Sequence, residues 1–278
     1  MKKAWLLAYV AAIIIAGCAS DTSSDKAESR VYRKNSKQID EASLNFYSLP
    51  SPLEIAYSIN RTGIEYSPEM LHNPDISGRY STVKAMALNL GIYGADLSYS
   101  LYFNKQQVAV RYMGAVKSLA GNLDISDLLS QERLKTFEDN LQDKEMLKKL
   151  VSQTFFHSDA FLKESNRSET AAMIMVGGWI ESLYIACRLS GSKSDSNAEL
   201  TGSIIEQSLV AQTTAGLLKT FNSKDIAYLT ADVNKLILLF AAADKTKEKS
   251  IDNLPDNDSF SKLCSGVEEI RSRYTQLF

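Results

Sequence analysis

The chain has 278 residues, with 31 basic and 33 acidic side chains and a formal net charge of −2. This near-balance argues against the strongly basic surface that nucleic-acid binding requires, so no nucleic-acid partner is expected. The length suits one large domain or two small ones, and the three cysteines and two histidines show no metal-ligand spacing, so no metal or cofactor is expected.

Residues 1–17 have the pattern of an export signal. Two lysines precede an apolar run over 4–15, which is shorter than the about 20 residues that a membrane span needs. Small residues at 16 and 17 then lead to Cys18. The run "IAGC" resembles the lipobox of bacterial lipoproteins, which implies cleavage before Cys18 and attachment of lipid to its thiol. The alternative is an ordinary signal peptide followed by a chance cysteine.

Acyl chains such as palmitate on Cys18 would hold the protein at a membrane, because each buried CH₂ contributes about 0.8 kcal/mol. Ala19, rather than Asp, follows the cysteine. Under the Gram-negative sorting rule this favours the outer membrane. The sequence does not decide between its periplasmic and external faces. Residues 18–47 are polar and without apolar period, which is typical of a flexible tether. A single domain is predicted over 48–278.

This domain is predicted to be all-α, because apolar residues recur at helical spacing and no segment shows sustained strand alternation. We expect a compact multi-helix bundle or stacked helical hairpins of about nine helices, with an irregular helical solenoid as the alternative. Predicted first residues or caps include Thr82, Asp143, Ser168, Asn197, Ser223 and Asp258. The predicted helices lie near 51–63, 82–103, 105–120, 127–141, 143–165, 169–190, 198–221, 224–244 and 259–276.

The helix predicted over 82–103 is apolar on nearly every side, which indicates burial in the core. A narrow polar stripe nevertheless runs along it. Its members follow one another at spacings of four, three and four residues, and these spacings keep them on one line: Asn89, Tyr93, Asp96 and Ser100.

The helix predicted over 169–190 resembles it, since its only charges beyond the first turn are Glu181 and Arg188. They are seven residues apart and therefore share a face. Gly177 and Gly178 lie one turn earlier, and each costs roughly 1 kcal/mol relative to Ala inside a helix. Such glycines predict a close approach, either by another helix or by a ligand.

An unpaired buried carboxylate is costly, so Asp96 and Glu181 need partners or protons. One hypothesis is a core polar network in which Arg188 bridges an acid. Asn89, Tyr93 and Ser100 would then complete the hydrogen bonds. The other hypothesis is a ligand pocket between the two helices, because bundles often build sites from a few polar groups in an aromatic wall. Its lining would be Asn89, Asp96, Tyr99, Trp179, Glu181 and Tyr184.

Three remaining features favour structural interpretations. Cys187 and Cys264 are either buried free thiols or a disulfide in an exported protein. His72 and His157 are too far apart for a metal motif. Polar residues that share one side of the helix over 224–244 predict a solvated face: Asp225, Tyr228, Asp232 and Lys235.

Known catalytic signatures are missing, since the chain has no G-x-S-x-G elbow, phosphate-binding glycine loop, H-E-x-x-H or C-x-x-C. The leading functional hypothesis is a non-catalytic interaction or accessory module at the cell envelope, with an envelope protein as partner. The second is a binder of a small or amphiphilic ligand. The third is a hydrolase in which Asp96 and Glu181 act on a sugar.

The segments "LPSPLEIAYSINRTGIEY" at 49–66 and "ALNLGIYGADLSYS" at 87–100 resemble a family of predicted Bacteroidota lipoproteins. In this family a lipobox and a polar tether precede an all-helical domain. The resemblance implies localisation and fold, and it assigns no activity and no catalytic residues.

Overall fold

The protein is described by a computed structural model that covers residues 52–126, 131–143, 145–147, 149–151, 167–191, 197–247 and 254–276. These residues form helices and connecting segments and contain no strand, which confirms the all-α prediction. The predicted signal peptide, Cys18, the tether and His157 lie outside them. The helices are α2 (Pro52–Arg61), α3 (Val83–Tyr102), α4 (Gln106–Asn122), α5 (Gln131–Asp139), α7 (Ser168–Leu189), α8 (Ala198–Leu218), α9 (Lys224–Lys247) and α10 (Asn257–Tyr274).

Side-chain caps set several helix starts as predicted. Thr82 accepts a hydrogen bond from the Ala85 N–H at 3.1 Å, and Asn197 accepts one from the Leu200 N–H at 2.9 Å. Two predicted caps, Ser168 and Asp258, are not the capping residues. Residue 167 precedes α7 without a side-chain cap, and α10 begins two residues early because Asp256 accepts from the Ser259 N–H at 2.8 Å.

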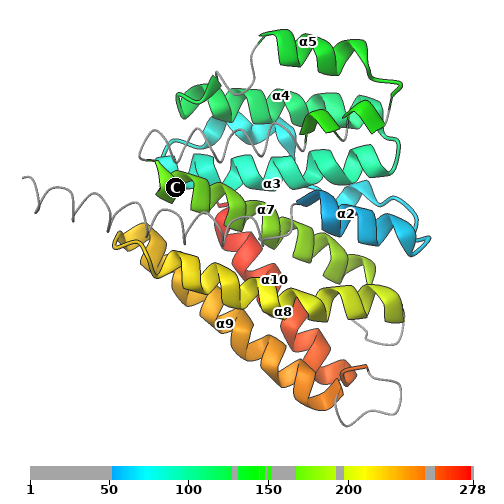
Figure 1. Cartoon of the computed structure of the whole chain (residues 1–278), viewed down its shortest axis with the longest axis vertical. Helices are drawn as coiled ribbons and strands as arrows, with labels where there is room; N and C mark the ends of the chain where they lie inside the picture. Colours follow the sequence, from blue (N-terminus) through cyan, green and yellow to red (C-terminus); the bar gives the residue numbers. More distant parts are fainter. Residues whose placement is uncertain are drawn as a thin grey trace, which may run out of the picture. The chain divides into compact units, whose positions relative to one another are not determined.

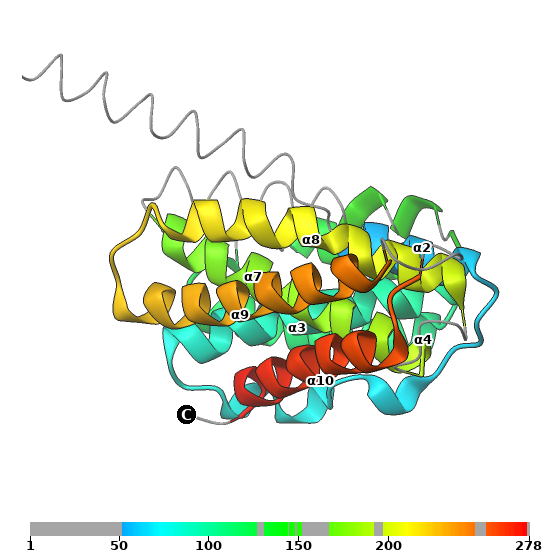
Figure 2. The same cartoon turned by 90° about the horizontal axis from the view of Figure 1, so that it is seen from below.

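The helices stack in layers around α3 and α7, which pack directly on each other (Figure 1). Helices α4 and α5 lie on one side of this pair, and α8 and α9 lie on the other. Helix α10 returns to pack against α9, α7 and α3, and Figure 2 shows α9 between α8 and α10. This return of the last helix closes the bundle, so the described residues favour the compact arrangement over a solenoid.

The contact between α3 and α7 depends on glycine. A Cβ atom on Gly177 would lie 2.1 Å from the Leu88 carbonyl oxygen, and one on Gly91 would lie 1.9 Å from the Ile174 carbonyl oxygen. Both distances are far below van der Waals contact. The close approach predicted at Gly177 is therefore made by a neighbouring helix.

Helix α3 is the centre of the core, as its all-round apolar sequence predicted. Every residue from 85 to 101 is buried, including the four members of the polar stripe. Helix α7 is buried nearly as completely. Two titratable helix-borne carboxylates therefore lie inside the protein, at Asp96 and Glu181.

The predicted solvated side of α9 is wrong at Asp232, whereas the side chains of Asp225 and Lys235 are 49% and 42% exposed. Asp232 is only 5% exposed and forms an ion pair with Arg273 of α10. Lys84 of α3 pairs with Asp225 at 3.0 Å and lies over the Tyr228 ring. Helix α9 thus turns this polar side partly inward, because α3 and α10 supply the opposite charges there.

Candidate functional site: a buried polar seam

Glu181 of α7 and Arg271 of α10 form the strongest ion pair of the site. The Arg271 Nε donates to Glu181 Oε2 at 2.8 Å, and Nη2 donates to Oε1 at 3.0 Å. The Glu181 side chain is fully buried and that of Arg271 is 14% exposed. This two-point geometry is the one in which an arginine binds a carboxylate most strongly. Tyr184 covers the guanidinium, with 4.6 Å between the Arg271 Cζ and the ring centroid.

Arg188 is not the partner of Glu181, so this predicted bridge is wrong. Arg188 is half exposed and approaches Glu268 of α10 at 3.8 Å. The face that carries Glu181 and Arg188 does form a charged contact, but with α10. Glu268 and Arg271, three residues apart on α10, meet Arg188 and Glu181 in antiparallel order.

Asp96 of α3 lies beside this pair and is fully buried. Burial and the neighbouring Glu181 raise the pKa of Asp96 well above its usual range, although Arg271 and a backbone hydrogen bond oppose the rise. Burial also raises the pKa of Glu181, and Arg271 opposes that rise. Arg271 is thus the direct charge partner of Glu181, and of the two carboxyls Asp96 is the one whose surroundings favour the protonated form.

The Asp96 carboxyl also holds the irregular link between α2 and α3. The His72 N–H donates to Asp96 Oδ2 at 3.1 Å, and the Tyr112 hydroxyl donates to the His72 carbonyl at 3.0 Å. The His72 ring contacts the Tyr80 hydroxyl at 2.6 Å. Burial, with a smaller effect of Arg271, lowers the pKa of His72 to about 3. His72 is therefore neutral and structural.

The remaining members of the stripe serve the same link and the end of α10. The Asn89 amide donates to the carbonyls of Ala85 and Tyr274, both at 2.9 Å. The Tyr93 hydroxyl donates to the Asn73 carbonyl at 2.9 Å. Ser100 lies next to the Tyr66 hydroxyl and lowers the pKa of Tyr66, while burial raises it more strongly.

The aromatic residues predicted to line one pocket point to different neighbours. Tyr99 accepts a hydrogen bond from the Ser67 N–H at 3.0 Å. Trp179 donates to Gln207 of α8 at 3.2 Å. Since Trp179 and Glu181 are two residues apart at about 100° per residue, they leave α7 in nearly opposite directions. The six residues predicted as a lining therefore do not converge on one space.

Cys187 and Cys264 continue the contact between α7 and α10 as buried free thiols. A hydrogen bond with Cys264, together with burial, raises the pKa of the Cys187 thiol well above its usual range. The Cys187 thiol is therefore not an activated nucleophile at neutral pH.

We call this group of largely buried residues the polar seam: Asp96, Glu181, Arg271, His72, Tyr80 and Tyr112. Its two carboxyls are closed to solvent. Asp96 and Glu181 have no exposed surface, so a substrate could reach them only if helices separated. No cluster of three metal-ligating side chains occurs in the described ranges. Sequence reasoning missed Arg271, His72, Tyr80 and Tyr112 as members. Arg271 lies 90 residues from Glu181 along the chain, and only an unpartnered acid on α7 pointed to a missing cation.

Fold and site together define an all-helical domain with an internally neutralised polar core. No protein-family model, curated protein or solved structure matches the chain.

Proposed function

We propose that this protein is a lipoprotein, anchored through Cys18 at the outer membrane, whose helical domain is a non-catalytic interaction or accessory module. The anchor rests on the order of lysines, apolar run, small residues and cysteine at the start of the chain. The partner is an envelope protein. This proposal includes membership of the lipoprotein family that the chain resembles.

The proposed interaction role is supported by the solvent-exposed side of α9. Residues Lys224–Asp244 are apolar enough to cross a membrane, yet only 39% of their most apolar window is buried, against 89% in α7. Leu238 is 73% exposed. Uncharged residues at helical spacing extend its face along α9 and are all exposed: Ala227, Ala231, Asn234, Ala241 and Ala242.

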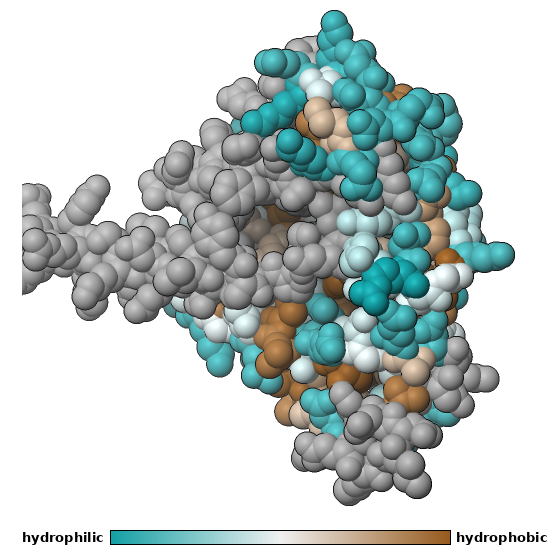
Figure 3. Space-filling model, turned by 45° about the vertical axis from the view of Figure 1, so that its right-hand side comes forward, coloured by the Kyte–Doolittle hydropathy of each residue, from teal (hydrophilic) through white to brown (hydrophobic). Residues whose placement is uncertain are grey.

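Lys224, at the start of α9, lies at the same helical angle as Ala242 and is exposed, but the face carries no charge from Ala227 to Ala242. A solvent-facing stretch of helix without charges typically marks a contact surface. On the face drawn in Figure 3, hydrophobic residues gather in the lower half, while the upper half is mostly hydrophilic. Small residues on one helix allow a second helix to approach closely. We therefore assign the partner contact to α9, centred on Leu238.

The hydrolase and the α3–α7 ligand pocket receive less support. Both carboxyls are fully buried, and the backbones of α3 and α7 approach closely at Gly91 and Gly177. Acid–base catalysis needs a group within hydrogen-bond reach of its substrate. A buried ion pair with a complete partner set is instead a typical structural element.

Two experiments in the native host test the proposal. Labelled palmitate should enter the wild-type protein and not Cys18→Ser, which should also leave the membrane fraction. A photo-crosslinking residue at position 238 should join the anchored protein to a discrete partner. The same residue at Val110, a 37% exposed position on α4, should give none. Unlabelled wild-type protein, or equal adducts at both positions, would contradict the proposal.

A further inference from the structure

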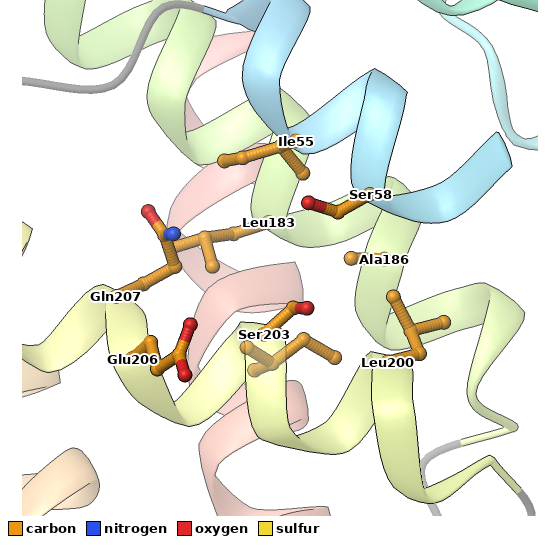
Figure 4. A pocket seen from close by; sticks show the side chains of 9 residues that line it. Ile55, Ser58, Leu183, Ala186, Leu200, Ser203, Glu206 and Gln207 are labelled. Atoms are coloured by element: carbon orange, nitrogen blue, oxygen red, sulfur yellow. The ribbon is translucent and has the colours of Figure 1, made fainter. Parts of the chain in front are cut away.

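A pocket of about 200 Å³ opens between α2, α7 and α8, on the side of α7 away from Glu181 (Figure 4). Its floor is apolar and consists of core side chains. Leu183 and Ala186 come from α7, Ile55 comes from α2, and Leu200 and Ile204 come from α8. For scale, a dry cavity of about 150 Å³ accommodates benzene. The space therefore suits a compact hydrocarbon group of about that size.

Two free hydroxyls face this floor. Helical serines elsewhere donate to the carbonyl four residues earlier, as Ser98 does to Gly94 and Ser182 does to Gly178, both at 2.8 Å. Ser58 of α2 and Ser203 of α8 make no such bond, and their hydroxyls point into the pocket (Figure 4). Each can donate one hydrogen bond and accept others.

Two neighbouring residues complete the polar rim. Gln207 is held in place because its Oε1 accepts from the Trp179 indole at 3.2 Å, which leaves its NH₂ group available. Glu206 is exposed and has no ion-pair partner among the described residues. Among the described residues that line the pocket it is the only charged one, so these residues give negative charge at one side and hydrocarbon at the base.

We propose that this pocket binds a small organic cation, with a compact apolar body and a primary ammonium group. The apolar body would cover Leu183 and Ala186, and the ammonium would donate to Glu206 and to the Ser203 hydroxyl. An anion would meet the Glu206 carboxylate, and the described lining residues include no cation to offset it. The site is separate from the α9 face, so its test does not depend on the partner contact.

Benzylammonium is a suitable probe, with benzyl alcohol and benzoate as matched controls of the same body. Saturation-transfer NMR and calorimetric titration on the full chain in detergent measure binding. Because an exposed charge pair contributes modestly, benzylammonium should bind roughly two- to fivefold more tightly than benzyl alcohol. Benzoate should bind most weakly. Equal binding of all three probes, or no binding, would overturn the proposal.

Variants locate the site. Glu206→Gln should remove the advantage of benzylammonium over benzyl alcohol, whereas Glu132→Gln, an equally exposed change on α5, should keep it. Ser203→Leu should abolish binding of both by filling the pocket. Melting curves establish that each variant is folded, and if Ser203→Leu unfolds, Ser58→Leu replaces it from the opposite wall. Unchanged binding in Glu206→Gln and in the pocket-filling variant would place the probe elsewhere and overturn the assignment.

Discussion

The polar groups on the two sides of α7 differ in burial and in hydrogen bonding. Toward α3 and α10, Glu181 is fully buried and receives two hydrogen bonds from Arg271. Toward α2 and α8, the hydroxyls of Ser58 and Ser203 and the carboxylate of Glu206 face an open pocket and have no partner within the described part of the chain. Satisfied buried groups contribute to stability, whereas free groups beside an apolar floor are available to a ligand. The carboxylates that are most conspicuous in the sequence, Asp96 and Glu181, are thus the ones enclosed in the core.

The largest expected effect comes from leaving one charge of the seam unpaired. Glu181→Leu should lower the free energy of unfolding by about 3–5 kcal/mol, because Arg271 then stays buried without a partner. The double variant Glu181→Leu with Arg271→Met should recover most of this loss. Denaturant unfolding measures both. A double variant as unstable as the single one would mean that the pair is not an isolated charge unit.

The second largest effect is expected where the backbones of α3 and α7 approach most closely, at Gly177. Gly177→Ala should cost about 3 kcal/mol or more, since the new methyl group would overlap the Leu88 carbonyl. Gly216→Ala on α8 is the matched control, because nothing lies within 4 Å of its added Cβ. It should stabilise by about 0.4–1 kcal/mol. Thermal unfolding that ranks the two variants equally would refute the close contact.

The dependence of folding stability on pH should distinguish His72 from Asp96. The lowered pKa of His72 makes stability fall as pH drops from about 6.5 toward about 3, because only the unfolded chain takes up the proton. The raised pKa of Asp96 makes stability fall as pH rises above its ordinary 3.8, because only the folded chain keeps the proton. Each slope approaches about 1.4 kcal/mol per pH unit, and the two oppose each other in the pH range directly above about 4, where both shifts act.

Replacing Asp96 or His72 removes its contribution to the pH dependence of stability, so the other contribution can be measured. Relative to wild type, Asp96→Asn should become less stable on acidification over this window, and His72→Gln should become more stable. Unfolding free energies at several pH values measure the differences, in which the contributions of surface carboxylates cancel. The same pH dependence in both variants would show that the seam does not set these protonation states.

The smallest effect is expected on the pocket side. Glu206→Gln should change stability by less than about 0.5 kcal/mol, because the carboxylate is exposed and has no ion-pair partner among the described residues. Chemical denaturation beside the Glu181 variants makes the comparison direct. A loss near that of Glu181→Leu would erase the distinction between the two faces of α7.

Local sequence patterns predicted the helices, but they could not identify ion-pair partners that are distant in the sequence. Helix α3 was predicted as buried from its apolar periodicity, and Gly177 was predicted as a close contact from its helix cost. The partner of Glu181 could not be found in this way, because Arg271 meets it only after α10 folds back across α7. Likewise, Asp232 looks solvated on a helical wheel until Arg273 is placed beside it. His72 lies in a segment without period, so nothing local marked it.

The central claim is that Asp96 is a protonated structural group beside the Glu181–Arg271 pair. Carboxyl ¹³C NMR tests it most directly, with the Asp96 resonance assigned by its loss in Asp96→Asn. We expect this resonance to keep the shift of a protonated carboxyl at pH 6, where exposed aspartates are ionised. A resonance that titrates near pH 4 with the surface aspartates would contradict the account.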